Sequence, residues 1–175
     1  MLLDLSKMRG AHDRFVRAFE PSAVDQDGEV YRVVKAVSLP FDIYKDHRQL
    51  RLVGRMTTTL ELACGRCLER FTFEVDEPFD LLYLPHDENV GEGEIAIEDD
   101  DLNTAYYRDD VIDLGQLMRE QFYLVLPMKP LCSESCRGLC PECGANLNAG
   151  TCGCVRRVED PRWDALRSLA DRGKN

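Results

Sequence analysis

The chain has 175 residues, 44% of them hydrophobic, which is enough to bury one ordinary core with a small additional module. Its formal net charge of −10 argues against a nonspecific RNA-binding protein, because lysines and arginines on phosphates supply most of the affinity of such proteins. The amino-terminal stretch is interrupted by Asp4, and no window holds the roughly 18 apolar residues of a membrane span. We therefore expect neither a signal peptide nor a membrane anchor.

The first half of the chain has the pattern of β-strands. Five segments are short and rich in β-branched, aromatic or alternating residues: 32–39, 49–54, 56–62, 70–75 and 79–84. They predict an antiparallel sheet or a small β-barrel.

The negative charge lies mainly in the next stretch. Residues 87–113 hold eleven acidic side chains against Arg108, a net charge of −10, whereas residues 128–175 carry a net charge of +2. We expect residues 86–112 to form an acidic surface loop, with a strand at Thr104–Arg108.

A helix is predicted at residues 113–126, with Asp113 as its N-cap and a proline, Pro127, after its end. Its apolar face holds Leu114, Leu117, Met118, Phe122 and Val125. A last helix is predicted to begin at Asp160 and Pro161, with Trp163, Leu166 and Leu169 towards one side.

These elements predict an α+β fold in two parts. The first is a β-rich domain of residues 1–127, with a helix packed on an antiparallel sheet or small barrel. The second is a Cys-rich zinc module with a C-terminal helix, residues 128–175. The segment from Cys132 to Cys154 is too polar to form a hydrophobic core, so we expect disulfides or a bound metal ion to stabilise it.

Eight cysteines form four pairs: Cys64/Cys67, Cys132/Cys136, Cys140/Cys143 and Cys152/Cys154. Without an export signal the expected compartment is the reducing cytoplasm, where cysteines in this pattern bind metal more often than they form disulfides. A structural zinc ion takes four ligands in a tetrahedron, and two cysteines across a tight turn can direct both sulfurs at one ion. The pairs therefore predict two zinc ions per chain. The strongest signal is the knuckle Cys140-Pro-Glu-Cys143-Gly144, because its glycine permits a left-handed exit.

The spacing favours one division of the pairs between the two ions. A short loop separates the pair Cys140/Cys143 from the pair Cys152/Cys154, and closing this loop around one ion costs little entropy. The other ion would then join Cys64 and Cys67 to Cys132 and Cys136 and hold the tail against the sheet. A local site made by residues 132, 136, 140 and 143 stays open, and so does iron–sulfur ligation, although such knuckles favour zinc.

Catalytic interpretations have less support. Cys64-Gly-Arg-Cys67 matches the motif of thiol oxidoreductases, but there the motif opens a helix, whereas here it lies between two predicted strands. His12, His47 and His86 are far apart in sequence, and an all-thiolate zinc site leaves no open position for water. We predict that the protein is not an enzyme, and we assign it no catalytic residue and no small-molecule substrate.

Several motifs together resemble a known family, the YceD-like proteins, also called large ribosomal RNA subunit accumulation proteins. The motifs are Cys64-Gly-Arg-Cys-Leu68, Asp113-Leu-Gly-Gln-Leu-Met-Arg-Glu-Gln121, Leu126-Pro-Met-Lys-Pro-Leu-Cys132, Gly138-Leu-Cys-Pro-Glu-Cys-Gly-Ala-Asn-Leu-Asn148 and Asp160-Pro-Arg-Trp-Asp-Ala-Leu166. The resemblance implies a role in the accumulation or processing of large-subunit ribosomal RNA in bacteria and plastids. Some relatives lack the second cysteine cluster, so its presence places this chain in a metal-rich branch.

The leading hypothesis is a cytoplasmic, non-enzymatic factor for ribosome biogenesis that binds zinc structurally. Its expected partner is a large-subunit ribosomal RNA precursor or a basic large-subunit ribosomal protein, which the acidic loop would suit. The candidate RNA contacts are Arg137, Arg156, Arg157, Arg162 and Arg167. The alternatives are a zinc-linked thiol redox switch or thiol oxidoreductase, and a structural protein–protein adaptor without RNA contact.

Overall fold

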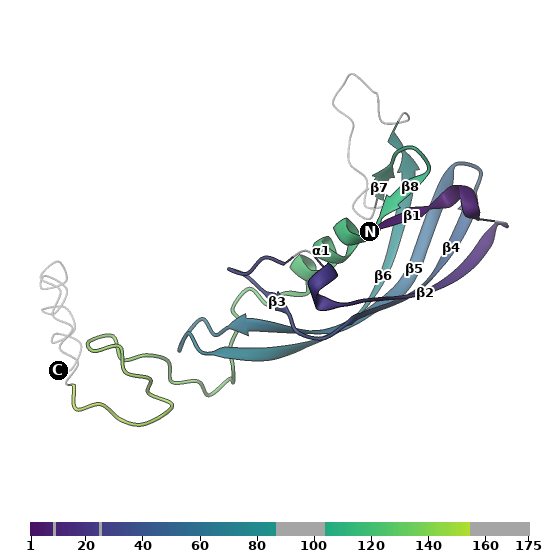
Figure 1. The fold of residues 1–175 in the computed structure, drawn as a ribbon. Coiled ribbons are helices and arrows are strands. Elements are labelled where there is room, and N and C mark those ends of the chain that lie inside the picture. Colours follow the sequence, from purple (N-terminus) through teal and green to yellow (C-terminus); the bar gives the residue numbers. More distant parts are fainter. Residues whose placement is uncertain (9, 25, 87–103, 155–175) are drawn as a thin grey trace, which may run out of the picture.

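The structure is a computed structural model, and it describes residues 1–8, 10–24, 26–86 and 104–154 (Figure 1). The elements in chain order are β1 (Leu2–Asp4), η1 (Leu5–Lys7), β2 (His12–Phe19), η2 (Pro21–Ala23), β3 (Arg32–Val33), β4 (Val37–Asp46), β5 (Gln49–Ala63), β6 (Arg70–Pro85), β7 (Thr104–Tyr107), β8 (Val111–Asp113) and α1 (Leu114–Val125). The acidic residues 87–103 and the predicted C-terminal helix lie outside the described residues.

The fold is α+β, as predicted, and it is dominated by one open sheet. The strand order is β2-β4-β5-β6-β7, with β3 beside β5, and β1 and β8 form a separate two-stranded sheet. In the part of the chain that the structure describes, the edge strands β2 and β7 do not pair, so the barrel alternative is not realised. The pairs are antiparallel except for β6 and β7, which run parallel.

The centre of the sheet is a long hairpin made by β5 and β6. The two strands predicted at 49–54 and 56–62 form the single 15-residue strand β5, and those at 70–75 and 79–84 form the 16-residue strand β6. The reason is that the alternation continues across the predicted break: Leu52, Met56 and Leu60 are all buried on the same face. The hairpin therefore carries its turn, residues 64–69, to one end of the sheet.

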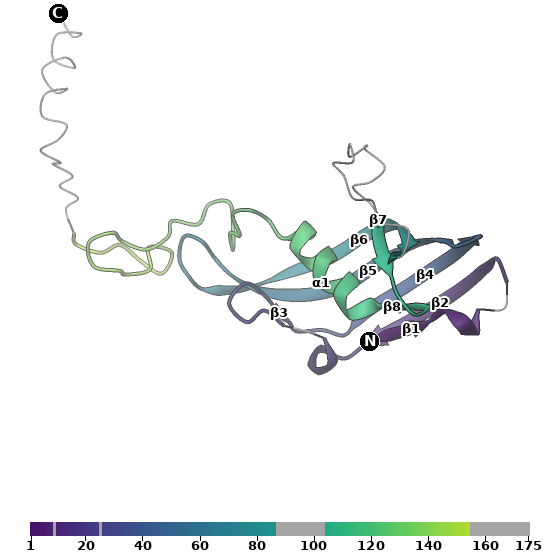
Figure 2. The same cartoon turned by 90° about the horizontal axis from the view of Figure 1, so that it is seen from above.

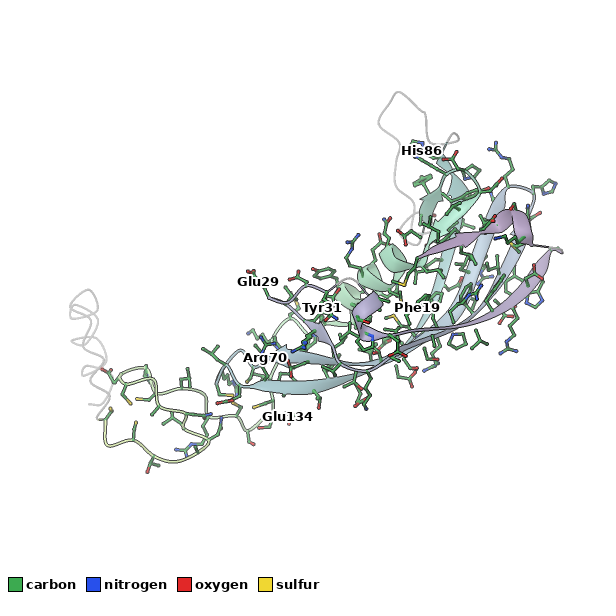
Figure 3. The ribbon with its side chains drawn as sticks, in the orientation of Figure 1. Phe19, Glu29, Tyr31, Arg70, His86 and Glu134 are labelled. Carbon is green, nitrogen blue, oxygen red and sulfur yellow. The ribbon has the colours of Figure 1, made fainter. Side chains whose placement is uncertain are left out.

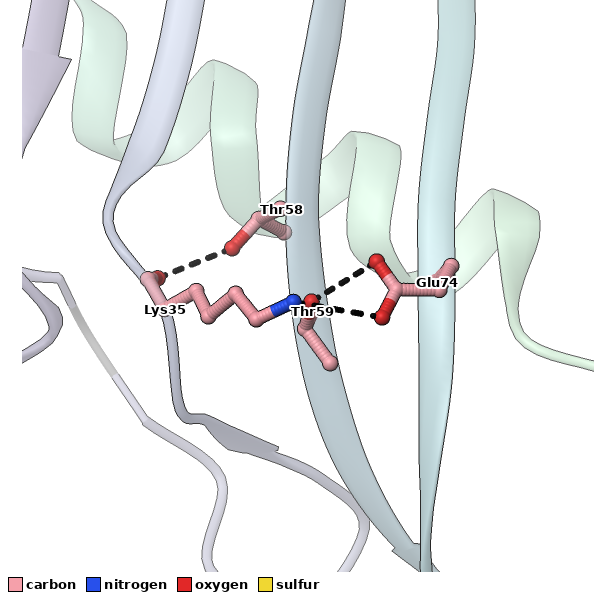
Figure 4. Close-up of polar contacts among 4 residues, drawn as sticks. All are labelled: Lys35, Thr58, Thr59 and Glu74. Carbon is pink, nitrogen blue, oxygen red and sulfur yellow. Dashed lines mark hydrogen bonds and ion pairs between the residues drawn. The ribbon is translucent and has the colours of Figure 1, made fainter.

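The predicted strand at 32–39 is divided into β3 and β4. Between them the chain leaves the ladder, and the Thr58 Oγ1 hydroxyl donates to the Lys35 carbonyl at 2.9 Å (Figure 4). The Thr59 hydroxyl, which is 1% exposed, donates to Glu74 Oε2 at 2.8 Å, and Lys35 Nζ lies 3.4 Å from Glu74 Oε1. These contacts satisfy two buried hydroxyls and attach the crossing segment to β5.

Helix α1 covers the apolar face of the sheet (Figure 2). Asp113 caps it as predicted, because the carboxylate accepts from the Gly115 backbone N–H at 2.8 Å. The buried residues on its inner face are Leu114, Leu117, Met118 and Phe122. The Phe122 ring meets the buried Tyr31 ring edge-on, with centroids 5.3 Å apart. This contact holds the last turn of α1 against the core. Because α1 ends directly before the cysteine-rich segment, it determines where that segment starts.

The opposite face of the sheet is solvated, and several of its arginines are paired with acids. Arg51 Nε donates to Asp80 Oδ1 at 2.8 Å, and Arg55 Nη1 lies 2.6 Å from Asp76 Oδ1. Such exposed pairs add only about 0–1 kcal/mol each to stability. The pairing also neutralises Arg51 and Arg55, so these two side chains offer little net positive charge to a phosphate backbone.

The two ends of the sheet differ in chemistry. Figure 3 shows His86, after which the acidic residues follow in sequence, at the opposite end of the molecule from Arg70 and Glu134. Arg70 starts β6 next to the hairpin turn, and Glu134 belongs to the cysteine-rich segment. Within the described residues, no helix has the length and apolar character needed to cross a membrane.

Gly54 provides a test of the sheet packing. A Cβ at this position would lie 2.6 Å from the Phe41 Cβ, 2.6 Å from the Pro40 carbonyl oxygen and 2.7 Å from the Phe79 ring. We expect Gly54→Ala to lower the free energy of unfolding by about 1–3 kcal/mol, because neither backbone nor core can yield without strain. The matched control is Gly28→Ala, where nothing lies within 4 Å. Urea denaturation should separate the two variants, and equal stabilities would contradict the packing described.

Candidate metal centres

Two groups of four cysteine sulfurs stand at the hairpin end of the molecule. The first quartet is Cys64, Cys67, Cys132 and Cys136, and the second quartet is Cys140, Cys143, Cys152 and Cys154. Within each quartet the four sulfurs all lie within 4.8 Å of one another. This is the division that the loop lengths favour, and the local alternative made by residues 132, 136, 140 and 143 does not form.

The sulfur spacing fits a single tetrahedral ion in the first quartet. Cys64 Sγ lies 3.7 Å from Cys136 Sγ, and Cys67 Sγ lies 3.7 Å from Cys132 Sγ. A zinc–sulfur bond of about 2.3 Å gives a tetrahedron with an edge of about 3.8 Å. A disulfide would bring its sulfurs to about 2.05 Å, and all eight cysteines are free thiols. The residues present therefore fit a tetrahedrally coordinated divalent ion.

The two quartets differ in burial. In the first quartet Cys132 is exposed, whereas Cys64, Cys67 and Cys136 are at most 4% exposed and form a small core with Phe71 and Leu131 packed against it. In the second quartet Cys140 is buried, whereas Cys143 and Cys154 are exposed. The first quartet is thus continuous with the sheet, and the second lies at the molecular surface.

Each quartet starts from a knuckle, and the two knuckles have the same backbone geometry. In the first, the Leu68 N–H donates to the Cys64 carbonyl at 2.9 Å; in the second, the Gly144 N–H donates to the Cys140 carbonyl at 2.8 Å. Leu68 and Gly144 both have positive φ, 61° and 73°. The motif Cys64-Gly-Arg-Cys67 therefore forms the turn between β5 and β6, as predicted, and it does not open a helix.

The backbone of the two knuckles favours a thiolate at the first cysteine of each knuckle, Cys64 and Cys140. Backbone hydrogen bonds, first from Cys67 and then from Cys132, lower the pKa of Cys64 to about 6. Backbone hydrogen bonds from Cys143 and Glu142 lower the pKa of Cys140 to about 7. These N–H groups point at sulfur without any cation, so the turn itself prepares an anionic ligand.

Two thiols, one in each quartet, resist ionisation in the absence of a cation. The pKa of Cys132 rises to about 12, chiefly through its side-chain hydrogen bond with Cys136 and through desolvation. The pKa of Cys154 also rises to about 12, chiefly through its hydrogen bond with Cys143. Four sulfurs this close cannot all carry negative charge unless a cation lies among them. A divalent ion would supply that charge and make all four thiols ligands.

The hairpin turn is also attached to the cysteine-rich segment by hydrogen bonds. The Gly65 N–H donates to the Pro130 carbonyl at 2.8 Å, and the Leu139 N–H donates to the Arg66 carbonyl at 3.1 Å. The Arg66 guanidinium Nη1 donates to the carbonyls of Glu134 and Cys136 at 3.1 and 2.9 Å. The first quartet is therefore one part of a continuous junction between turn and segment.

Two residues of this junction were missed from the sequence. Arg66 stands inside the knuckle motif, which was a usable signal for a role near the first quartet. Asn148 gave no such signal, yet its Nδ2 donates to Cys136 Sγ at 3.3 Å and is the main cause of the lowered pKa of Cys136. Both contacts join residues far apart in the chain, so sequence spacing could not indicate them.

The three histidines, which were not predicted as site residues, do not join the quartets. His12 bonds Asp42 at 2.8 Å, His47 bonds Asp46 at 2.7 Å, and His86 contacts Arg108. Across the described residues, the two quartets are the groups of three or more His, Cys, Asp or Glu side chains that could hold an ion. Arg137 is exposed beside the first quartet. The other candidate RNA contacts, Arg156, Arg157, Arg162 and Arg167, lie outside the described residues.

Comparison with known proteins gives a consistent family. The family model described as "Large ribosomal RNA subunit accumulation protein YceD" matches residues 52–170, which include all eight cysteines and α1. The chain is 28% identical over 169 residues to "Large ribosomal RNA subunit accumulation protein YCED homolog 1, chloroplastic" of Arabidopsis thaliana, covering 85% of this chain and 53% of that protein. It is 30% identical over 157 residues to the protein of the same name from Zea mays, covering 77% and 53%.

A bacterial relative lies within the same set. An uncharacterized protein of Mycobacterium tuberculosis is 34% identical over 103 residues, covering 59% of this chain and 47% of its own length. The chain thus spans about half the length of the curated relatives it matches. No solved structure matches the chain significantly.

Leu68 tests the knuckle geometry. It is 66% exposed and holds the left-handed conformation that glycine holds in the second knuckle. Glycine removes the clash of the side chain with its own backbone, which costs roughly 1–2 kcal/mol in this conformation. We expect Leu68→Gly to be more stable than Leu68→Ala by about 1 kcal/mol, since alanine loses the same contacts but keeps the strain. Thermal denaturation measures the difference, and a more stable alanine variant would rule out the assigned turn.

Proposed function

The chain belongs to the YceD family of large ribosomal RNA subunit accumulation proteins, and from this membership we propose that it is a non-enzymatic accessory factor in ribosome biogenesis. In this proposal it supports the accumulation or processing of large-subunit ribosomal RNA. Each cysteine quartet binds one structural zinc ion, giving two ions per chain. The observation that carries the proposal is that the family match includes both quartets, so the candidate metal centres are part of the family region.

Zinc is the ion that we propose for both quartets. Four thiolates in a tetrahedron suit zinc or iron, and the short knuckles with their N–H donors to sulfur are typical of zinc. When bound, zinc would supply the positive charge that lets all four thiols ionise. With four protein ligands no position is left for water, which supports a structural role and not hydrolysis.

The charge distribution supports two separate contact surfaces. His86, after which the acidic residues follow in sequence, lies at the opposite end of the molecule from Glu134 (Figure 3), and Arg137 is three residues after Glu134 in the cysteine-rich segment. On the solvated face between them, Arg51, Arg55 and Arg70 are paired with acids. We propose that a basic large-subunit ribosomal protein meets the acidic stretch, while the arginines of residues 137–167 meet precursor RNA phosphates.

Two further statements belong to the same proposal. We propose the cytoplasm as the site of action, because reducing conditions keep eight thiols available for metal; the plant relatives are named chloroplastic. We also propose that residues 1–127 and 128–175 form two modules. The first quartet takes two ligands from each, so the modules would be joined by an ion and not only by the peptide chain.

The function is tested by the ratio of large- to small-subunit ribosomal RNA in cells that lack the gene. We expect this ratio to fall and to recover with the wild-type gene. A double variant, Cys64→Ser with Cys136→Ser, should not restore it, because removing two of four ligands abolishes the first centre. Ser135→Ala is the matched control, since Ser135 is exposed in the same segment and contacts Ser133 without touching sulfur. An unchanged ratio in the deletion strain would refute the proposed function.

A further inference from the structure

Asn148 lies in sequence between ligands of the second quartet, but its side chain contacts the first quartet. It lies in the loop between Cys143 and Cys152, which are two ligands of the second quartet. Its side chain nevertheless reaches the first quartet, where Nδ2 donates to Cys136 Sγ at 3.3 Å. No other side-chain amide in the described residues contacts a cysteine sulfur of either quartet within hydrogen-bond distance.

The hydrogen bonds around Asn148 define which way its amide points. The Arg137 backbone N–H donates to Asn148 Oδ1 at 2.7 Å, and this bond requires the oxygen on that side. The amide nitrogen must therefore face Cys136 sulfur, because the other orientation would place two donors together at Arg137. The Asn148 side chain thus contacts two adjacent residues: it donates to the Cys136 sulfur and accepts from the Arg137 backbone N–H.

The position of Asn148 depends on the loop that the second quartet closes. The Asn148 N–H donates to Asn146 Oδ1 at 2.9 Å, and the Leu147 N–H donates to the Gly138 carbonyl at 2.9 Å. At the start of this loop the Cys140 N–H donates to the Ala145 carbonyl at 2.8 Å. Cys152 and Cys154 bring the other end of the loop back to Cys140 and Cys143. An ion in the second quartet would therefore fix the loop that presents Asn148.

We propose that Asn148 is a positioning residue that couples the two metal centres, so that filling the second quartet strengthens ion binding at the first. This inference rests on the proposed metal binding. An N–H donor to a ligand sulfur stabilises the thiolate and orients it, and the loss of such an outer partner typically lowers metal affinity about 10–100-fold. Because coupling between sites is reciprocal, ion binding at the first quartet also favours the second.

The experiment uses the full-length, zinc-loaded protein and measures how well each cysteine is protected from N-ethylmaleimide as EDTA is added. Trypsin cleaves after Arg66 and Arg70, so Cys64 and Cys67 appear on separate peptides and report the first quartet directly. We expect Asn148→Ala to lower the EDTA concentration that half-exposes Cys64 and Cys67 by about 10–100-fold. The double variant Cys143→Ser with Cys154→Ser, which breaks the second quartet, should lower this EDTA concentration by a similar factor. Adding Asn148→Ala to that double variant should lower it no further.

Two more variants separate the sulfur contact from general damage to the loop. Asn148→Asp keeps an oxygen for the Arg137 N–H but brings no N–H to Cys136, so it should lose protection as Asn148→Ala does. Ser135→Ala should behave as wild type. Unchanged protection of Cys64 and Cys67 in Asn148→Ala or Asn148→Asp, or effects that multiply in the combined variant, would overturn the inference and leave the metal proposal standing, provided that the wild-type protein binds two ions. A wild-type protein that binds no ion would overturn the metal proposal and this inference together.

Discussion

The convergence of four thiols from two distant parts of the chain is the interaction on which the rest of the structure depends. Cys64 and Cys67 stand at the turn of the long β5–β6 hairpin, and Cys132 and Cys136 come from the segment after α1. That segment is polar and contains no α-helix or β-strand of three or more residues between 128 and 154. Its conformation is set by sulfur geometry and a few backbone hydrogen bonds, because it has too few apolar side chains to form an independent core.

The length of the β5–β6 hairpin is what brings Cys64 and Cys67 to the cysteine-rich segment. The alternation of buried residues runs through Gly54 and carries β5 to Ala63, so the hairpin turn extends beyond the part of the sheet that α1 covers. The turn therefore meets the cysteine-rich segment instead of solvent. A shorter β5 would move Cys64 away from Cys136. At the turn itself, Leu68 holds a left-handed conformation and its N–H donates to the Cys64 carbonyl, which closes the knuckle.

How much of this was available from the sequence depends on the range of each interaction. The caps and the apolar face of α1 are local, so Asp113 and Phe122 were identified correctly, and the cysteine pairs follow from short spacings. The edge strand β2 was missed because His12, Asp13, Arg14 and Arg17 obscure the alternation; only pairing with β4 makes it a strand. The contacts of Arg66 and Asn148 with the first quartet span more than ten residues, and no periodicity predicts them.

The central claim is that each quartet binds one zinc ion. Native mass spectrometry of the full-length protein, purified without added metal under reducing conditions, tests it most directly. The account predicts a mass increase equal to two zinc ions on a chain whose eight thiols are reduced. A mass equal to the bare chain, or one lowered by the hydrogens lost in disulfide formation, would contradict it.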